Sequence, residues 1–126
     1  MDRVLVIDND RVVRDSLTLT LEWAGYDVLG VDSPREGFAF HRENPASVVV
    51  ADDIYIDHDR LEHIQALRTY SPTLPIIAIS GTVPSTDQES DDLNNLLGHV
   101  YHLQKPFTVD EFLSTVKTAL PHVSHS

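Results

Sequence analysis

Four apolar runs in this sequence end at or just before a polar residue that could take part in phosphate chemistry. These residues are Asp8, Asp52, Ser80 and Lys105, in chain order. A carboxylate can attack phosphorus as a nucleophile, while a lysine ammonium and a hydroxyl can stabilise the charge on the transferring phosphoryl oxygens. The combination predicts a site that accepts a phosphoryl group on a carboxylate.

Further oxygen-bearing side chains lie beside these residues. Asp8, Asn9 and Asp10 follow the first apolar run, and Asp52 with Asp53 follows the third. Magnesium is typically held by one or two protein carboxylates together with water and substrate phosphate. The sequence therefore predicts that Mg²⁺ assists the phosphate chemistry.

The elements that position these residues follow from the spacing of apolar residues. Strands are expected near residues 4–7, 26–31, 48–51, 75–79 and 99–103. Helices are expected near 11–24, 34–43 and 59–70, after the capping pair Thr86 and Glu89, and from Thr108 to Pro121. This alternation predicts an α/β fold, a flavodoxin-like (βα)5 doubly wound parallel sheet of strand order 2-1-3-4-5. Ligands of such folds bind beyond the carboxyl ends of the strands, so the four polar residues should share one cleft.

Length and composition restrict the class of protein. A chain of 126 residues suits one domain, expected over 1–121 with 122–126 as a tail or the start of a linker. The formal net charge of −11 disfavours direct nucleic-acid binding, and the absence of cysteine excludes thiolate chemistry. No apolar stretch approaches membrane-spanning length and no signal peptide is evident, so we expect a cytoplasmic protein without membrane contact.

Several short motifs of the chain match the motifs of a known family. They are Asp52, then Asp59 and Leu61 at the positions of a family Asp-Gly-Leu, then Ser80-Gly81 and Lys105-Pro106-Phe107. Along nearly its whole length the chain resembles the receiver domain of response regulators in two-component signal transduction. The resemblance implies that a sensor histidine kinase or a phosphotransfer protein donates a phosphoryl group to Asp52.

The resemblance also implies roles for the other residues. Mg²⁺ would be held by Asp8, Asn9, Asp52 and the backbone carbonyl of Ile54. Lys105 would pair with the phosphoryl group, and Ser80 would move to bond it. His102 stands where receivers commonly carry a tyrosine or phenylalanine that swings inward with this movement, so it would share the switch role with Ser80.

Output would then depend on docking and not on catalytic turnover. The family surface that changes on switching comprises the fourth helix, the fifth strand and the fifth helix. The resemblance implies that this surface binds a downstream protein or a second copy in a homodimer.

Some positions depart from the family pattern. Asn9 replaces the second of two acids, so we expect weaker Mg²⁺ binding because an amide oxygen carries no charge. Ile56 and Arg60 replace a frequent proline and a glycine, which changes the loop after Asp52. These changes favour an alternative, a pseudo-receiver that binds proteins without phosphorylation. Retention of Asp52, Ser80 and Lys105 argues against it.

Two further expectations concern neighbouring acids. Residues 4–12 also fit the opening of haloacid-dehalogenase-like phosphatases, with Asp8 as nucleophile and Asp10 as acid. The order of the remaining motifs is wrong for that class. Beside Asp52, Asp53 should point to the opposite face because adjacent strand residues alternate.

The apolar residues of the first helix, Trp23 included, are expected to pack in the core.

Overall fold

The fold is described from a computed structural model over residues 2–53, 58–81, 97–98 and 100–120. The strands are β1 (Arg3–Ile7), β2 (Asp27–Val31), β3 (Val48–Asp52), β4 (Ile76–Ser80) and β5 (Val100–Gln104). The helices among these residues are α1 (Arg11–Trp23), α2 (Pro34–Glu43), α3 (His58–Tyr70) and α5 (Val109–Ala119). The helix predicted after Thr86 and the tail beyond residue 121 lie outside the described residues.

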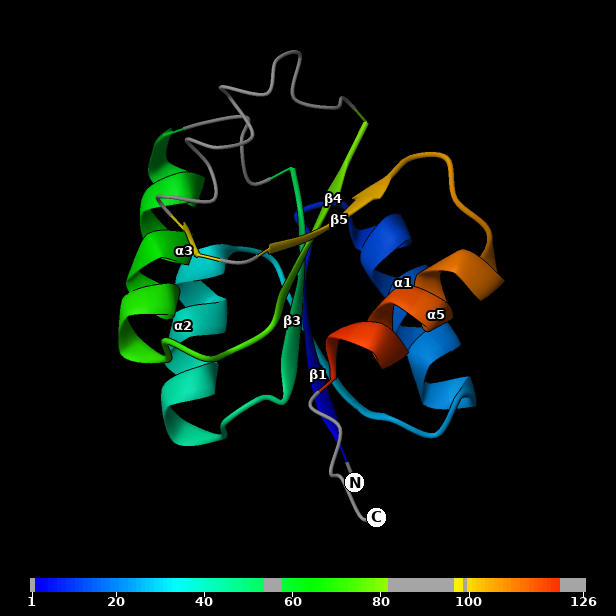
Figure 1. The fold of residues 1–126 in the computed structure, drawn as a ribbon, viewed down its shortest axis with the longest axis horizontal. Coiled ribbons are helices and arrows are strands. Elements are labelled where there is room, and N and C mark those ends of the chain that lie inside the picture. The colour runs from blue at the N-terminus through cyan, green and yellow to red at the C-terminus, as the bar shows by residue number, and fades with distance from the viewer. Residues whose placement is uncertain (1, 54–57, 82–96, 99, 121–126) are drawn as a thin grey trace.

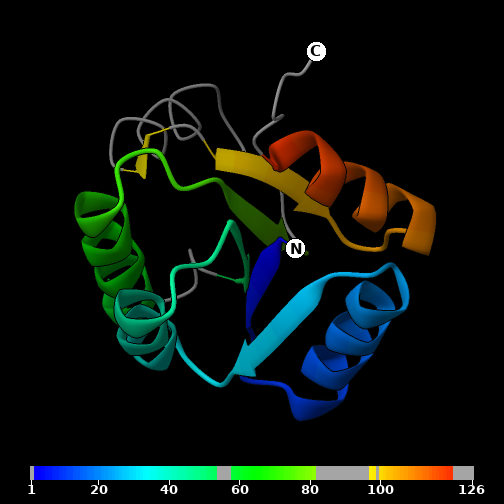
Figure 2. The ribbon, with the colours of Figure 1, turned by 90° about the horizontal axis from the view of Figure 1, so that it is seen from below.

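The strands form one parallel five-stranded sheet in the order β2-β1-β3-β4-β5. This is the predicted flavodoxin-like arrangement. The helices α2 and α3 cover one face of the sheet, and α1 and α5 cover the other (Figures 1 and 2). Since all strands run in the same direction, their carboxyl ends meet at one edge, at the top of Figure 1.

Each face of the sheet has its own core. Alternation along β1 sends Leu5 and Ile7 into a cluster with Ile64 and Leu67 of α3. The intervening side chains join a second cluster, in which α1 contributes Leu17 and Leu21 and α5 contributes Phe112 and Val116. Because both faces are covered, the central strands are apolar except at their ends: β1 begins with Arg3, and β3 and β4 end in Asp52 and Ser80 at the functional edge.

Side-chain caps set the starts of three helices. Asp10 accepts from the backbone N–H groups of Val12 and Val13, and Ser33 accepts from that of Glu36. The predicted capping box at the start of α5 is present. The Thr108 hydroxyl accepts from the backbone N–H of Glu111, and the Glu111 carboxylate accepts from the backbone N–H of Thr108. These caps place the helix starts close to the carboxyl ends of the strands.

Helix α2 approaches the sheet closely at Gly37. A Cβ added there would lie 2.7 Å from Ile7 Cδ1 and 3.4 Å from Leu5 Cδ2. We expect Gly37→Leu to lower the free energy of unfolding by about 1–3 kcal/mol through overpacking, measured by urea denaturation. Gly81→Leu is the control, because a Cβ at Gly81 meets nothing within 4 Å. Equal stability of the two variants would contradict the proposed close contact.

The prediction that Trp23 packs in the core is wrong. Its side chain is 89 % exposed, and Leu19 and Val12 on the same helix are also exposed. The core positions of α1 are Leu17 and Leu21, which are separated by one helical turn. The helix therefore has apolar residues on its outer surface as well as on its inner one.

Candidate functional site

Asp52 and Lys105 form the centre of the polar edge. Asp52 is the last residue of β3 and is 9 % exposed. Lys105 follows β5, and its backbone N–H donates to the carbonyl of Ser80 over 2.9 Å, which aligns the segment with the end of β4. The Lys105 Nζ lies 2.9 Å from Oδ1 and 3.0 Å from Oδ2 of Asp52, and it donates a hydrogen bond to Oδ2. The pair joins two strand ends 53 residues apart in the sequence.

Asp8 lies just beyond β1 and is 2 % exposed. Its backbone N–H donates to the Val31 carbonyl over 3.0 Å, and its Oδ1 accepts from the backbone N–H of Asp10 over 2.8 Å. Burial raises the pKa of Asp8 to about 6, since the hydrogen bond from Asp10 offsets only part of the effect and the nearby charge of Asp52 adds to it. The carboxyl is thus held where it is costly to ionise without a cation.

Lys105 is held in its charged form. Burial alone lowers the pKa of Lys105, but the hydrogen bond from its ammonium to Asp52 and the charges of Asp52, Asp53 and Asp8 raise it overall. The ammonium is therefore a permanent positive charge beside the Asp52 carboxylate. Such a fixed cation can neutralise charge that arrives on a phosphoryl group.

Asp8 Oδ2 is buried and has no hydrogen-bond partner, whereas the buried Oδ1 of Asp52 is ion-paired with Lys105 Nζ over 2.9 Å. An unsatisfied buried oxygen on Asp8, beside a second acid, fits a hard divalent cation. Among the described residues, no three acidic, histidine or cysteine side chains are grouped as a ready metal site. Mg²⁺ does not require three, because it keeps several water ligands and is commonly bound by one or two carboxylates.

The prediction that Asp53 points away from the site is wrong. Its Oδ2 lies 4.0 Å from Lys105 Nζ. The residue has a positive φ of 50°, so the alternation of a regular strand no longer applies to it. Its N–H donates to the Ile79 carbonyl over 2.9 Å, and its own carbonyl accepts from Arg60 over 3.5 Å. The doubled acid in the sequence was a signal for a second carboxylate near the lysine.

The other predicted site residues are placed less centrally. Ser80 ends β4, one residue beyond the partner of Asp52 in the sheet register. Asn9 follows Asp8 with an exposed side chain, and His102 lies within β5 and is also exposed. Ile54, the predicted carbonyl ligand, lies outside the described residues.

The side chain of Asp10 caps helix α1. Its Oδ1 caps α1 by accepting from the N–H groups of Val12 over 2.9 Å and of Val13 over 3.3 Å. A residue that caps a helix is poorly placed to act as the acid of a phosphatase or to replace a missing metal ligand. Of Asp10 and Asp53, only Asp53 has its carboxylate near Lys105.

Comparisons with known proteins agree with this geometry. The sequence profile of the family described as "Response regulator receiver domain" matches residues 4–117. The chain belongs to the response regulator receiver domain family. Response regulator MprA of Mycolicibacterium vanbaalenii is 32 % identical over 124 residues, which cover 94 % of this chain and 50 % of that protein. The receiver-domain chain thus spans about half the length of the curated relatives it matches.

Solved receiver structures have the same fold. The chemotaxis protein CheY4 of Vibrio cholerae superposes with a TM-score of 0.82 at 26 % identity, covering 95 % of this chain and 99 % of that one. A response regulator from Thermotoga maritima gives a TM-score of 0.78 at 25 % identity, with 94 % and 97 % covered. The predicted family and fold are therefore both confirmed.

Several properties are general to the family. Receiver domains are signalling modules of two-component systems, generally bind Mg²⁺ at the phosphorylation site and are generally not turnover enzymes. Response regulators interact with histidine kinases and with downstream effectors. Within the described part of the chain, no helix has both the length and the apolar character needed to cross a bilayer.

Proposed function

We propose that Asp52 of this receiver domain accepts a phosphoryl group from a histidine kinase or a phosphotransfer protein. The observation that carries the proposal is the buried Asp52 carboxylate, held against the Lys105 ammonium and beside Asp8, whose Oδ2 is buried without a hydrogen-bond partner. We assign the receiver domain to residues 1–121, as predicted from the sequence.

The proposed reaction transfers a phosphoryl group from an imidazole nitrogen of the donor to a carboxylate oxygen of Asp52. A carboxylate oxygen of Asp52 attacks phosphorus, the bond from phosphorus to the donor imidazole nitrogen breaks, and that nitrogen keeps the electron pair. An acyl phosphate forms on Asp52 and the donor histidine becomes neutral after taking up a proton. Lys105 remains protonated and moves from pairing with the carboxylate to pairing with a phosphoryl oxygen.

Two groups would neutralise charge on the phosphoryl oxygens. Lys105 supplies a positive charge from the residue after β5, and Asp8 with Asp52 would hold Mg²⁺, assisted by Asn9 and the Ile54 carbonyl. When bound, Mg²⁺ supplies positive charge to the phosphoryl oxygens and orients them. Asp8 contributes by keeping a buried oxygen available for the cation.

The signal would pass from Ser80 to the docking surface. Ser80 sits at the end of β4, and its carbonyl is already bonded to the Lys105 backbone. A phosphoryl group on Asp52 would draw the Ser80 hydroxyl toward it, and His102 on neighbouring β5 would respond. The output surface would include β5 and α5, and would bind a downstream protein or a second receiver.

The second candidate function is a pseudo-receiver, and Asn9 is the observation that favours it. The two functions are separated by incubating the intact chain with Mg²⁺ and a small phosphodonor and measuring its mass. A receiver gains one phosphoryl group per chain, whereas a pseudo-receiver gains none. Beryllofluoride, a phosphoryl mimic, is the second arm, with the response followed by NMR shifts of Ser80 and Lys105.

The loss of charge at position 9 predicts weak Mg²⁺ binding. We expect Asn9→Asp to raise Mg²⁺ affinity at neutral pH by about tenfold, since a third carboxylate adjoins the site and charge count sets affinity. Isothermal titration calorimetry on the unphosphorylated chain measures this directly. Asn44→Asp, which adds the same charge beyond the end of α2, is the control. Equal affinity of the wild type and Asn9→Asp would show that position 9 does not reach the cation.

A further inference from the structure

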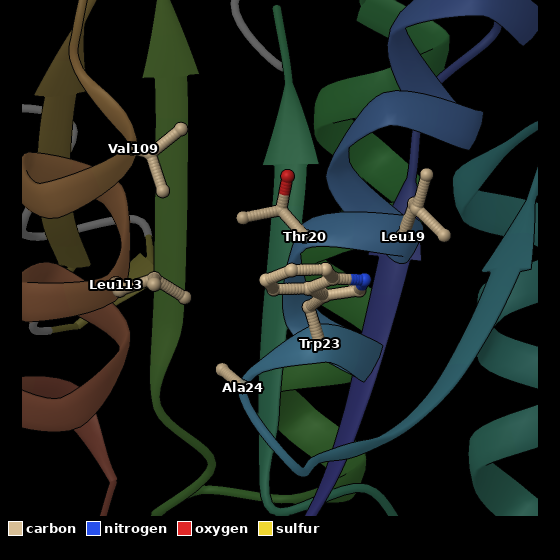
Figure 3. Close-up of a pocket in the computed structure, with 6 residues that line it drawn as sticks. All are labelled: Leu19, Thr20, Trp23, Ala24, Val109 and Leu113. Carbon is tan, nitrogen blue, oxygen red and sulfur yellow. The ribbon is translucent and has the colours of Figure 1, made fainter.

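Arg14 lies in the first turn of α1, and the phosphoryl transfer proposed above assigns it no role. Its side chain is only 17 % exposed. Arg14 and Thr18, one helical turn apart, lie on the side of α1 that faces β2. The groove of about 380 Å³ between α1 and α5 is lined by Thr20 and Trp23 on other sides of the helix (Figure 3). A charged side chain is thus largely buried between α1 and the edge strand of the sheet.

Strand β2 leaves room for the Arg14 side chain at Gly30. A Cβ added to Gly30 would lie 3.2 Å from Arg14 Cγ, 3.3 Å from Arg14 Cδ and 3.1 Å from Thr18 Cγ2. These distances are shorter than ordinary contacts between carbon atoms. The aliphatic part of Arg14 therefore packs directly against the backbone of β2, so packing as well as hydrogen bonding sets its position.

The guanidinium of Arg14 joins the carboxyl ends of β1 and β2. Its Nη1 donates to the backbone carbonyl of Asp8 over 2.8 Å and forms an ion pair with Oδ1 of Asp32, the residue after β2. One nitrogen can do both, because each Nη of arginine carries two N–H groups. Asp32 is itself fixed, since its backbone N–H donates over 3.0 Å to the carboxylate of Glu36 in the first turn of α2.

The bond from Arg14 completes the hydrogen bonding of the Asp8 backbone. The Asp8 N–H donates to the Val31 carbonyl, the Asp8 carbonyl accepts from Arg14, and Oδ1 accepts from the Asp10 N–H. The polar atom that remains is Oδ2, which is buried without a hydrogen-bond partner. Loss of Arg14 would leave a buried carbonyl unsatisfied, and the backbone at Asp8 would shift to recover a donor.

We propose that Arg14, held by Asp32, is a positioning residue for the cation site and keeps the Asp8 carboxylate where it can bind Mg²⁺. This inference rests on the proposed function, in which Asp8 holds the cation. Residues that orient a metal ligand without touching the metal change metal affinity by about 10–100-fold when they are removed. Arg14 acts in this way through the backbone of Asp8.

The sign of the change in Mg²⁺ affinity separates positioning from charge. By Coulomb's law alone, removing a positive charge near the site strengthens Mg²⁺ binding. Arg14→Met removes the charge and the N–H donors but keeps a long unbranched side chain, and we expect it to weaken Mg²⁺ binding by about tenfold. Calorimetric titration of the unphosphorylated full chain measures the affinity. Binding by Arg14→Met that equals or exceeds that of the wild type overturns the proposal.

Arg11→Met is the matched control, because it removes the same charge three residues earlier in the same helix. The Arg11 side chain is 84 % exposed and is paired with Asp15 over 3.7 Å. The Mg²⁺ affinity of Arg11→Met should therefore equal or exceed that of the wild type. Equal weakening by Arg11→Met and Arg14→Met overturns the proposal.

The role of Asp32 is tested by a double-mutant cycle. Asp32→Ala should weaken Mg²⁺ binding by at least about threefold, because it releases the guanidinium of Arg14. The double variant with Arg14→Met should match Arg14→Met alone to within about twofold, since Asp32 acts through Arg14. An unchanged affinity in Asp32→Ala, or single effects that multiply in the double variant, overturns the part assigned to Asp32.

A measurement without Mg²⁺ distinguishes failure of this inference from failure of the proposed function. Hydrogen exchange of the Asp8 and Asp10 backbone N–H groups, which donate to Val31 and to Asp8 Oδ1, is followed by NMR in metal-free buffer. In Arg14→Met, exchange at both should accelerate at least about fivefold more than exchange of the β4 amides. Equal acceleration at all these amides reports a loss of global stability and overturns the positioning role. A wild type that binds no Mg²⁺ contradicts the proposed function, and the exchange rates then decide whether Arg14 fixes Asp8.

Discussion

The substitution Asp52→Asn is expected to abolish phosphoryl incorporation completely. The amide keeps the size of the side chain but lacks the carboxylate oxygen that attacks phosphorus, so no acyl phosphate can form. With Mg²⁺ and a small phosphodonor, intact-protein mass spectrometry should show one added phosphoryl group on the wild type and none on the variant. Thermal denaturation of the same samples checks that the variant is folded.

The matched control is Asp53→Asn, which makes the same chemical change one residue later. Both carboxylates face Lys105, but Asp52 is bonded to it and Asp53 lies 4.0 Å away. Phosphoryl incorporation should therefore persist in Asp53→Asn. Labelling that survives in Asp52→Asn and disappears in Asp53→Asn would transfer the acceptor role to the neighbour. Labelling absent from the wild type would favour the pseudo-receiver.

The contrast between these two acids shows what the sequence could and could not predict. Asp52 was placed correctly at the end of a buried strand, because apolar runs and their polar ends are local features of the sequence. The direction of Asp53 depends on a backbone φ of 50°, which residue type alone does not specify. The fold and strand order were therefore predictable, whereas the side-chain direction just beyond the strand was not.

The exposure of Trp23 in α1 is a second feature that the sequence pattern could not predict. Apolar residues in α1 predicted an amphipathic helix correctly, but they occur on two sides of it, and periodicity alone did not decide which side is buried. Leu17 and Leu21 contact the sheet because the path of the chain from β1 turns that side inward. The exposure of Trp23 is a property of the tertiary structure.

The raised pKa of Asp8 makes the stability of the folded protein depend on pH. Its pKa is raised from the usual 3.8 to about 6, so the folded protein binds a proton at this site more tightly than the unfolded chain does. The stabilisation that this proton provides is present below pH 4 and is lost as the pH rises from about 4 to about 6. Above that range the ionised, buried carboxylate lowers stability by up to about 3 kcal/mol in the absence of a cation.

We therefore expect Asp8→Asn to raise the free energy of unfolding by about 1–3 kcal/mol at pH 7.5 in buffer without divalent cations. The amide can still accept the N–H of Asp10, and it removes a charge beside Asp52. Below pH 4 the advantage of the variant should vanish, since Asp8 of the wild type is then protonated. Urea denaturation across this pH range measures the difference.

Addition of Mg²⁺ should reverse the order of stability at neutral pH. A cation that binds only the folded state stabilises it in proportion to the logarithm of its concentration relative to the dissociation constant. The wild type should gain stability with Mg²⁺, and Asp8→Asn should gain little because it lacks one of the two buried carboxylates. Asp10→Asn is the control, since asparagine caps a helix about as well as aspartate and the Mg²⁺ response should persist. The same Asp8 carboxylate lowers stability when it is ionised without a cation and raises stability when it binds Mg²⁺. An Asp8→Asn variant that is no more stable than the wild type at pH 7.5 without Mg²⁺ would therefore show that the buried charge of Asp8 does not lower the free energy of unfolding.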